Sequence, residues 1–398
     1  MKSAKVLLIL TIIIVVGFAF NFYIQNLPGI TPVIKHPPDD IAKILNTTGM
    51  PLKLREGITI SIFAKDLPGA RVLLFDTLGN LWVSQTREGI ISLITIENGK
   101  VMNSNPVFKN LKNPHGLALD PDDPFMLYIA EEDKISRFKI YSEGKFKKIA
   151  DLPCCGGHFT RTIGFGPDKR LYVSIGSSCN VCDEKNPQRA TIISMKKDGT
   201  DIKEFARGLR NSVFFTWHPE TNKMWATDMG RDLIGDDIPP DEINIVLEGK
   251  DYGWPLCYGK NILDTNFHND DHTHIINDCD DSIKMKSHID IQAHSAPLGL
   301  SFIKNGWPTE FQDNLLVAFH GSWNRTVPTG YKIVRYNLPK CKAENLPPEK
   351  CVEAFIDGWL TNDGALGRPV DIISHKNNVF VSDDKAGVIY KIDYKKNG

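Results

Sequence analysis

The sequence predicts an all-β fold, a six-bladed β-propeller, because one short pattern recurs six times. Each copy is an apolar run of about four residues that ends in a small residue, and most copies follow a polar turn. The copies begin at Leu81, Leu127, Leu171, Met224, Leu315 and Val379. A strand-turn-strand unit cannot bury its apolar face alone, so neighbouring copies must pack together. Closing six of them into a ring removes the exposed sheet edges.

The spacing of the copies supports one large propeller in this chain of 398 residues. Successive copies (81, 127, 171, 224, 315, 379) are 46, 44, 53, 91 and 64 residues apart. A four-stranded blade takes about 40–50 residues, so the early gaps fit and the two longest gaps must hold insertions. We expect the ligand site at the mouth of the axial channel, where the innermost strands begin.

The N-terminus has the pattern of an export signal. Two lysines precede an apolar run over residues 6–20, which is short for a membrane-spanning helix of about 20 residues but is extended by the aromatic residues that follow. We expect residues 1–25 to form a signal-anchor helix or a cleaved signal peptide, 26–50 a linker and 51–396 the propeller. Either form of the signal places the propeller outside the cytoplasm, in the periplasm or at the cell surface. An uncleaved helix would anchor it to the membrane, and a cleaved signal would leave it secreted.

Eight cysteines indicate disulfides in an exported protein. Cys341 is predicted to pair with Cys351, and Cys257 with Cys279 across the insertion in the longest gap. The pairing of the remaining four is left open; they are Cys154, Cys155, Cys179 and Cys182. The CxxC spacing of the last two also suits a metal or a haem, but residue 183 is not the histidine of a haem site and no second CxxC occurs.

Polar side chains are predicted to gather at the channel mouth. His158 and Arg210 each lie nine residues before the proline of the next turn, so they hold equivalent places ahead of the innermost strands. Arg368 and His115 stand just ahead of the corresponding stretches in two other blades, and Asn211 follows Arg210. Taken singly, each of these residues fits a surface loop as well as it fits a binding site. Gathered at one place, they indicate an anionic ligand, because buried polar groups need partners.

Two further segments suggest cations. Residues 228–244 place several carboxylates in a loop rich in glycine and proline, which suits Ca²⁺ although the spacing is not that of an EF-hand. An acidic turn is the alternative. Residues 268–281 are rich in His and Asp but lie in an insertion, where a solvated loop is the simpler interpretation.

Six stretches within residues 51–393 carry a resemblance to a known family. They are Gly156-Gly157-His158, Val173-Ser174-Ile175-Gly176, Gly208-Leu209-Arg210-Asn211, Asp241-Glu242-Ile243-Asn244, Tyr252-Gly253-Trp254-Pro255 and Gly367-Arg368-Pro369-Val370-Asp371. Through them the chain resembles the glucose/sorbosone dehydrogenase family, six-bladed quinoproteins that use pyrroloquinoline quinone (PQQ). The sorbosone-dehydrogenase-like branch is the most similar. Together the stretches are specific, whereas each alone is weak.

The resemblance implies a PQQ- and Ca²⁺-dependent oxidoreductase that oxidises an aldose or a related aldehyde to a lactone or acid. His158 matches the general base, which takes the proton of the C1 hydroxyl as hydride passes to the quinone. Arg210, Asn211 and Arg368 match residues that contact the cofactor, whose three carboxylates suit guanidinium partners. The electrons would pass to a quinone or a redox protein.

The resemblance also implies metal ligands. Gly230 and Arg231 match positions whose backbone carbonyls hold the Ca²⁺ that polarises the cofactor. Glu242 and Tyr252 match a second, structural calcium site.

Three positions depart from the family pattern. Ser177 stands where glucose-oxidising members carry an aspartate, and Val370 replaces a second arginine. An expected lysine after the fifth apolar run is absent, with His320 or Arg325 as a substitute. These changes leave the base and the core of the cofactor site in place but leave the substrate open.

Two other function classes compete. One is an extracellular propeller of the hedgehog-interacting type that binds ligands without redox activity, and retention of His158 with Arg210 and Asn211 argues against it. The other is a calcium-dependent, lactonase-like hydrolase, for which a ring of metal ligands, not arginines, would be expected at the mouth. Nucleic acid is not a predicted partner, because 47 Lys and Arg against 48 Asp and Glu leave no basic excess.

Overall fold

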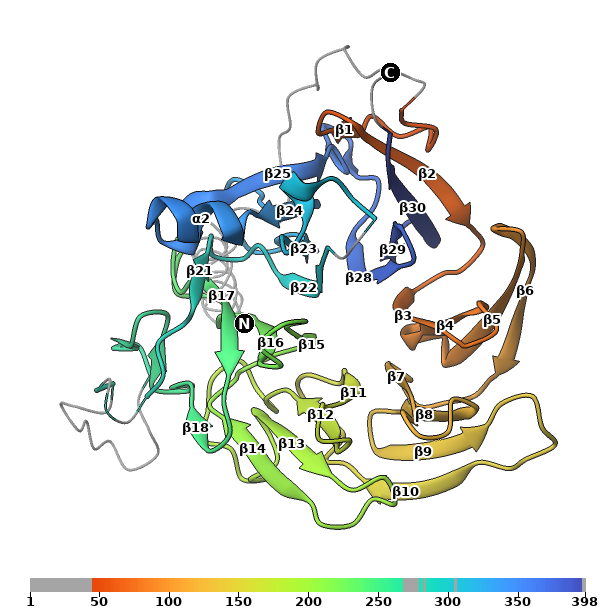
Figure 1. Cartoon of the computed structure of the whole chain (residues 1–398). Helices are drawn as coiled ribbons and strands as arrows, with labels where there is room; N and C mark the ends of the chain where they lie inside the picture. Colours follow the sequence, from red (N-terminus) through yellow and green to blue (C-terminus); the bar gives the residue numbers. More distant parts are fainter. Residues whose placement is uncertain (1–44, 268–278, 281, 283, 304–305, 396–398) are drawn as a thin grey trace, which may run out of the picture.

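The fold is a six-bladed β-propeller, as predicted from the repeats. The structure is a computed structural model that describes residues 45–267, 279–280, 282, 284–303 and 306–395. Six sheets of four strands or more surround a common axis, and all but one of the strand pairings within them are antiparallel (Figure 1).

The first three blades follow one another along the chain. The first contains β3 (Ala70–Phe75), β4 (Leu81–Gln85), β5 (Ile90–Glu97) and β6 (Lys100–Phe108). The second contains β7 (Gly116–Leu119), β8 (Met126–Ala130), β9 (Lys134–Lys139) and β10 (Lys147–Asp151). The third contains β11 (Ile163–Phe165), β12 (Leu171–Ile175), β13 (Thr191–Met195) and β14 (Lys203–Arg207), with β18 (Lys250–Asp251) added at its outer edge.

The last three blades include the insertions and both ends of the ring. The fourth contains β15 (Phe215–Trp217), β16 (Met224–Asp228), β17 (Asp241–Val246) and β21 (Ile289–Ile291). The fifth contains β22 (Pro297–Phe302), β23 (Leu315–Phe319), β24 (Lys332–Tyr336), β25 (Val352–Asp357) and β1 (Lys53–Leu54). The sixth contains β28 (Pro369–His375), β29 (Asn378–Asp383), β30 (Val388–Tyr394) and β2 (Ile58–Ala64).

Short elements decorate the long connections. Two small hairpins pair β19 (Cys257–Tyr258) with β20 (Ile262–Leu263) and β26 (Leu360–Thr361) with β27 (Gly364–Ala365). Within the described residues the α-helical structure is limited to α2 (Leu338–Glu344).

Each recurring apolar run is the second strand of its blade. These strands are β4, β8, β12, β16, β23 and β29, and nearly all of their residues are buried. Both faces of such a strand pack against neighbouring blades, so the sequence shows a continuous apolar run and not the alternation of a half-exposed strand. The second strand runs back toward the end where the innermost strand began, because the pair is antiparallel. One end of the ring therefore collects two loops from every blade.

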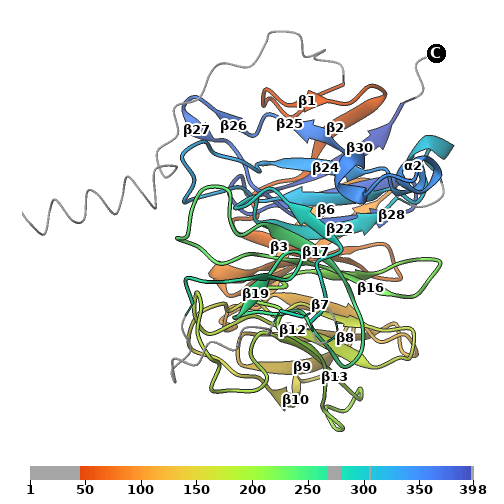
Figure 2. The same cartoon turned by 90° about the vertical axis from the view of Figure 1, so that its left-hand side faces the viewer.

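The ring is closed by strands from opposite ends of the described chain. β2 pairs antiparallel with β30, in a register that runs from Ile58 opposite Tyr394 to Ala64 opposite Ile389 (Figures 1 and 2). Ile58 and Ile60 are buried in a cluster with Trp359 of the sixth-blade connection. The N-terminal strand thus supplies the outer strand of the last blade and covers its edge.

Four disulfides occur in the structure. Cys341–Cys351 and Cys257–Cys279 confirm the two predicted pairs. The four cysteines left open form Cys154–Cys155 and Cys179–Cys182, so each pair lies within one loop.

The expected anchor segment, residues 1–25, lies outside the described residues, as does most of the segment 268–281. In the part of the chain that the structure describes, no helix has the length and apolarity needed to cross a membrane. Asn46, within the range expected for the linker, is buried and its side chain donates to the carbonyls of Met50 and Leu52.

Ring closure generates a prediction about stability. Ile60 in β2 is 1% exposed, whereas Ile62 in the same strand is 38% exposed. We expect Ile60→Ala to lower the free energy of unfolding by about 2–5 kcal/mol because it leaves a cavity in the closing blade. Ile62→Ala should change it by less than about 1 kcal/mol. Chemical denaturation of both variants with disulfides intact tests this, and equal effects of the two would contradict it.

Candidate active site

A cavity of about 440 Å³ lies at the end of the ring where both sets of loops meet. Its lining includes His158, Asn211 and Arg368 from the loops that precede innermost strands. A second cavity of about 230 Å³ shares these three residues and adds Arg210 and Gly230. The structure therefore brings together the candidate base and the candidate cofactor residues at the predicted place.

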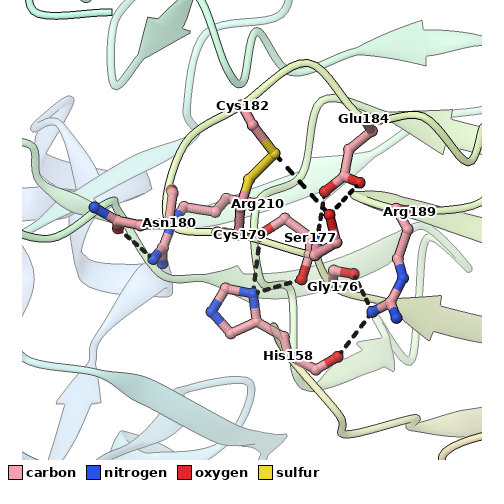
Figure 3. The surroundings of a disulfide bond; sticks show 10 residues. His158, Gly176, Ser177, Cys179, Asn180, Cys182, Glu184, Arg189 and Arg210 are labelled. Carbon is pink, nitrogen blue, oxygen red and sulfur yellow. Dashed lines mark hydrogen bonds between the residues drawn. A yellow bond between two sulfur atoms is a disulfide. The ribbon is translucent and has the colours of Figure 1, made fainter. Parts of the chain in front are cut away.

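His158 is held so that one ring nitrogen is committed to the protein. Its Nδ1 lies 3.1 Å from the carbonyl oxygen of Ser177 and 2.9 Å from the Ser177 hydroxyl (Figure 3). The Ser177 hydroxyl donates its own proton to the carbonyl of Cys179 at 2.7 Å. Both Ser177 oxygens can therefore only accept from Nδ1, which must carry the proton. The tautomer leaves the lone pair on Nε2, the nitrogen that a general base uses.

The charge state of His158 also suits a base. Burial, reinforced by the positive charge of Arg210, lowers the pKa of His158 to about 3. The imidazole is therefore neutral at pH 7 and can accept a proton.

Arg210 lies beside His158, but its guanidinium is engaged by the protein. Nε donates to the Asn180 carbonyl at 2.8 Å, and Nη2 donates to the Asn180 side-chain oxygen at 2.8 Å and approaches Asp232 at 3.3 Å. Nη1 donates to the carbonyls of Met229 and Gly230. All of its donors have partners, so in this arrangement Arg210 joins the loops of the third and fourth blades.

The Cys179–Cys182 disulfide supports both residues. It closes the loop that presents Asn180 to Arg210 and the Cys179 carbonyl to Ser177. Ser178 beside it donates to the Glu184 carboxylate from both its backbone nitrogen and its hydroxyl. The loop thus positions the candidate base and the arginine through a common support.

Gly176 allows His158 and Asn211 to approach each other. A Cβ atom at this position would lie 2.7 Å from both the Asn211 side-chain oxygen and the His158 Cβ. Asn211 is fixed by its backbone nitrogen, which donates to Asp228 at 2.6 Å. Only glycine fits between the two side chains.

Arg368 connects the sixth blade to the fifth at the mouth. Its backbone nitrogen donates to Asp383, and its side chain donates to the carbonyls of His320 and Gly321. The guanidinium lies over the ring of Tyr331 at 5.4 Å. These contacts keep its charge in both cavities.

Carboxylates surround the candidate calcium position at Gly230. The Gly230 nitrogen donates to Asp241 at 2.9 Å, and its carbonyl accepts from Arg210 at 2.8 Å. Burial raises the pKa of Asp241 to about 7 and raises that of Asp228 well above its usual value. The side chain of Arg231 turns to Asp264, with a distance of 3.1 Å between Nε and the carboxylate.

Glu242 and Tyr252 are fully used in packing the insertion. Glu242 accepts from the nitrogen of Gly259 and from the side chain of Asn244, and burial raises its pKa to about 7. The Tyr252 hydroxyl donates to the carbonyl of Ile245 at 2.6 Å. In the described ranges, three His, Cys, Asp or Glu ligand atoms come within 4.8 Å of one another only at Cys179, Cys182 and Glu184, where the two sulfurs are bonded to each other. The structure does not assemble such a group around Glu242.

His115 does not reach the mouth, so its expected place in the polar ring is wrong. It is fully buried, its ring packs against Phe214, and Nδ1 faces the hydroxyl of Thr162 at 3.3 Å. The physical reason lies next to it: a Cβ at Gly116 would stand 2.4 Å from the carbonyl of Arg161. The entry of the third blade packs over this position and closes it off.

The positions at which the sequence departs from the family pattern lie in different parts of the structure. Val370 belongs to the apolar core. Arg325 turns away from both cavities toward residues 236–237, which it contacts through Asp236 and Asp237. His320 lines both cavities, donates from Nε2 to the Asp384 carboxylate at 2.9 Å, and has its pKa lowered to about 4 by burial.

Four charged residues of the larger cavity escape the sequence analysis: Arg71, Arg87, Asp384 and Lys385. Arg87, Asp384 and Lys385 follow the second strands β4 and β29, the position at which Gly230 follows β16. A search of the residues that follow the second strand in every blade would have found these three, but not Arg71, which lies within β3.

Comparisons with known proteins identify a family and similar folds. The sequence model of a family described as TrAA12-like matches residues 52–395. An uncharacterized protein of Borreliella burgdorferi is 32% identical over 370 residues, which cover 87% of this chain and 91% of that protein.

Two solved structures resemble this one. The holo form of the pyranose dehydrogenase PQQ domain from Coprinopsis cinerea has a TM-score of 0.71 at 20% identity, covering 87% of this chain and 97% of that one. A calcium structure of a Trichoderma reesei protein of carbohydrate-active enzyme family AA12 has a TM-score of 0.72 at 20% identity, covering 88% and 100%. At 20% identity the likeness confirms the six-bladed fold.

The environment of His158 predicts its titration. Its lowered pKa means that the ring stays neutral as pH falls from 7, where an exposed histidine gains a proton near pH 6.5. We expect ring ¹⁵N NMR of the apo-protein to show the Nδ1-protonated neutral form down to about pH 4. Ser177→Ala removes the hydroxyl partner but keeps the carbonyl, so the tautomer should persist. Protonation of His158 near pH 6.5 would contradict this account.

Proposed function

Because the chain belongs to the TrAA12-like family, we propose that it is a PQQ-dependent oxidoreductase that oxidises a sugar at C1. The substrate class is an aldose or a related aldehyde, and the product is a lactone or acid. The observation that carries the proposal is His158, a neutral histidine with a committed Nδ1, beside a cavity lined by cations.

The residues present fit PQQ, which has three carboxylates. Arg368 lines both cavities, and Asn211 beside it offers a side-chain amide. Arg368 and Asn211 would hold the cofactor, with Arg210 supporting the wall behind it. Guanidinium groups bind carboxylates with paired, charge-assisted hydrogen bonds.

His158 performs the proton transfer in this proposal. Its Nε2 takes the proton of the C1 hydroxyl while the C1–H bond breaks and the C1–O bond becomes a carbonyl. PQQ, when bound, supplies the acceptor for the hydride and its two electrons, which an external quinone or redox protein then removes. Ser177 keeps the ring of His158 oriented while its charge changes.

Calcium at Gly230 is the second part of the proposal. Asp228 accepts from the backbone nitrogen of Arg210, Asp241 accepts from that of Gly230, and the Arg210 guanidinium contacts Asp232. A divalent cation would bind through the carbonyls of Gly230 and Arg231 and would favour the ionised form of these carboxylates. Glu242 and Tyr252, which are engaged elsewhere, are not needed for this site.

We also propose that the propeller works outside the cytoplasm, tethered by its N-terminal segment. Four disulfides support this location, because such bonds persist in oxidising compartments.

The proposed base has a direct test. We expect His158→Gln to lower kcat for sugar-dependent dye reduction by about 10²–10⁴-fold, the usual contribution of a general base. Its affinity for PQQ, measured by absorbance titration, should change by less than about fivefold, because His158 carries no charge at pH 7. His218→Gln, at the opposite end of the ring between β15 and β16, should be normal in both assays. Absence of PQQ binding at micromolar concentration with calcium present would refute the function.

The calcium proposal predicts a separate effect. Removing calcium with EGTA should weaken PQQ binding by at least tenfold, and calcium should restore it. Asp241→Asn, which removes a charge next to Gly230, should raise the calcium concentration needed for half-restoration. Unchanged PQQ affinity in EGTA would remove calcium from the site.

A further inference from the structure

The larger cavity carries more positive charge than its own carboxylate balances. Arg71, Arg87, Arg368 and Lys385 face it, and Asp384 is its single acidic lining residue. Burial lowers the pKa of His158 to about 3 and that of His320 to about 4, so neither histidine adds charge at pH 7. The lining therefore has a net charge of +3 (four cations and one carboxylate).

Asp384 is already occupied. One oxygen accepts from Arg71 at 2.8 Å, and the other lies 2.9 Å from Nε2 of His320. The Nε of Arg71 is buried and has no hydrogen-bond partner among the described residues. Arg87 and Lys385 are exposed at the rim and form no ion pair with any residue of the described ranges. Arg87 and Lys385 are thus available to a ligand that brings its own negative charge, whereas the charge of Arg71 is offset by Asp384.

These cations lie apart from the candidate cofactor residues. Arg210 and Gly230 line the smaller cavity, whereas Arg71, Arg87 and Lys385 line only the larger one. His158 lines both. A sugar whose C1 hydroxyl meets His158, with the cofactor on the side of Gly230, extends its far end toward these three residues.

We propose that Arg87 and Lys385 bind an anionic group at the far end of the sugar, so that the substrate is an acidic aldose. This inference rests on the proposed function for the assignment of C1 to His158. A carboxylate or a phosphate at C6 has the required chemistry, because both accept paired hydrogen bonds from a guanidinium. A neutral sugar would leave Arg87 and Lys385 without a charged partner.

Sugars that differ only at C6 test the proposal on the PQQ-loaded protein. We expect kcat/KM for D-glucuronate or D-glucose 6-phosphate to exceed that for D-glucose by at least tenfold, and the better of the two identifies carboxylate or phosphate. The preference should weaken with added salt, which screens charges over about 10 Å at 0.1 M. The double variant R87Q/K385Q should lose most of it through KM. The matched variant K100Q/K147Q, which removes the same charge from the outer strands β6 and β10, should keep it.

A binding measurement separates this inference from the proposed function. Saturation-transfer NMR on the unloaded protein should detect both acidic sugars more strongly than glucose, and R87Q/K385Q should abolish the difference. That result supports the anion site even if no sugar is oxidised. If glucose is oxidised as well as both glucuronate and glucose 6-phosphate, the inference is overturned while the oxidoreductase stays intact. A tenfold loss of PQQ affinity in R87Q/K385Q would also overturn it, because the cations would then serve the cofactor.

Discussion

The antiparallel pairing of β2 with β30 is the interaction on which the rest of the structure depends. Without it, β30 would be an open outer edge of the last blade, and the chain that leads into the first blade would not be joined to the last. The pairing joins residues near both ends of the described chain, and buried side chains such as Ile58 and Ile60 make it a packed interface as well as a ladder of hydrogen bonds. The position of every mouth loop follows from this closure.

At the mouth, the protein fixes protonation and charge before any ligand arrives. A carbonyl and a hydroxyl from Ser177 decide which nitrogen of His158 carries the proton, and burial keeps the ring neutral. The guanidinium of Arg210 donates hydrogen bonds to backbone carbonyls and to Asp232, which hold it in place. Its positive charge still acts on the site. Ser177, a departure from the family pattern, therefore takes a defined role as the partner of the base.

Repeats explain what the sequence could predict. The buried second strands produce the six apolar runs, and equivalent places in different blades correctly brought His158 and Arg368 to one cavity. The place of His115 in its repeat led to the wrong prediction that it lies at the mouth, because the tight approach at Gly116 depends on how two neighbouring blades pack. The partners of Arg210 come from loops without a repeat, such as the one that carries Asn180, so its engagement could not be predicted. The pairing of Cys154 with Cys155 likewise needed the loop geometry.

The ion pair between Arg71 and Asp384 has a consequence for assembly. It joins the first blade to the sixth at 2.8 Å, across the seam where the ring closes, and both residues line the larger cavity. The cavity therefore exists only after the C-terminal strands have been synthesised and have met β2. Any molecule that occupies the cavity contacts both the first and the last blade and so helps to hold the ring closed. Its binding free energy is added to that of closure, so an occupied propeller resists opening more than an empty one.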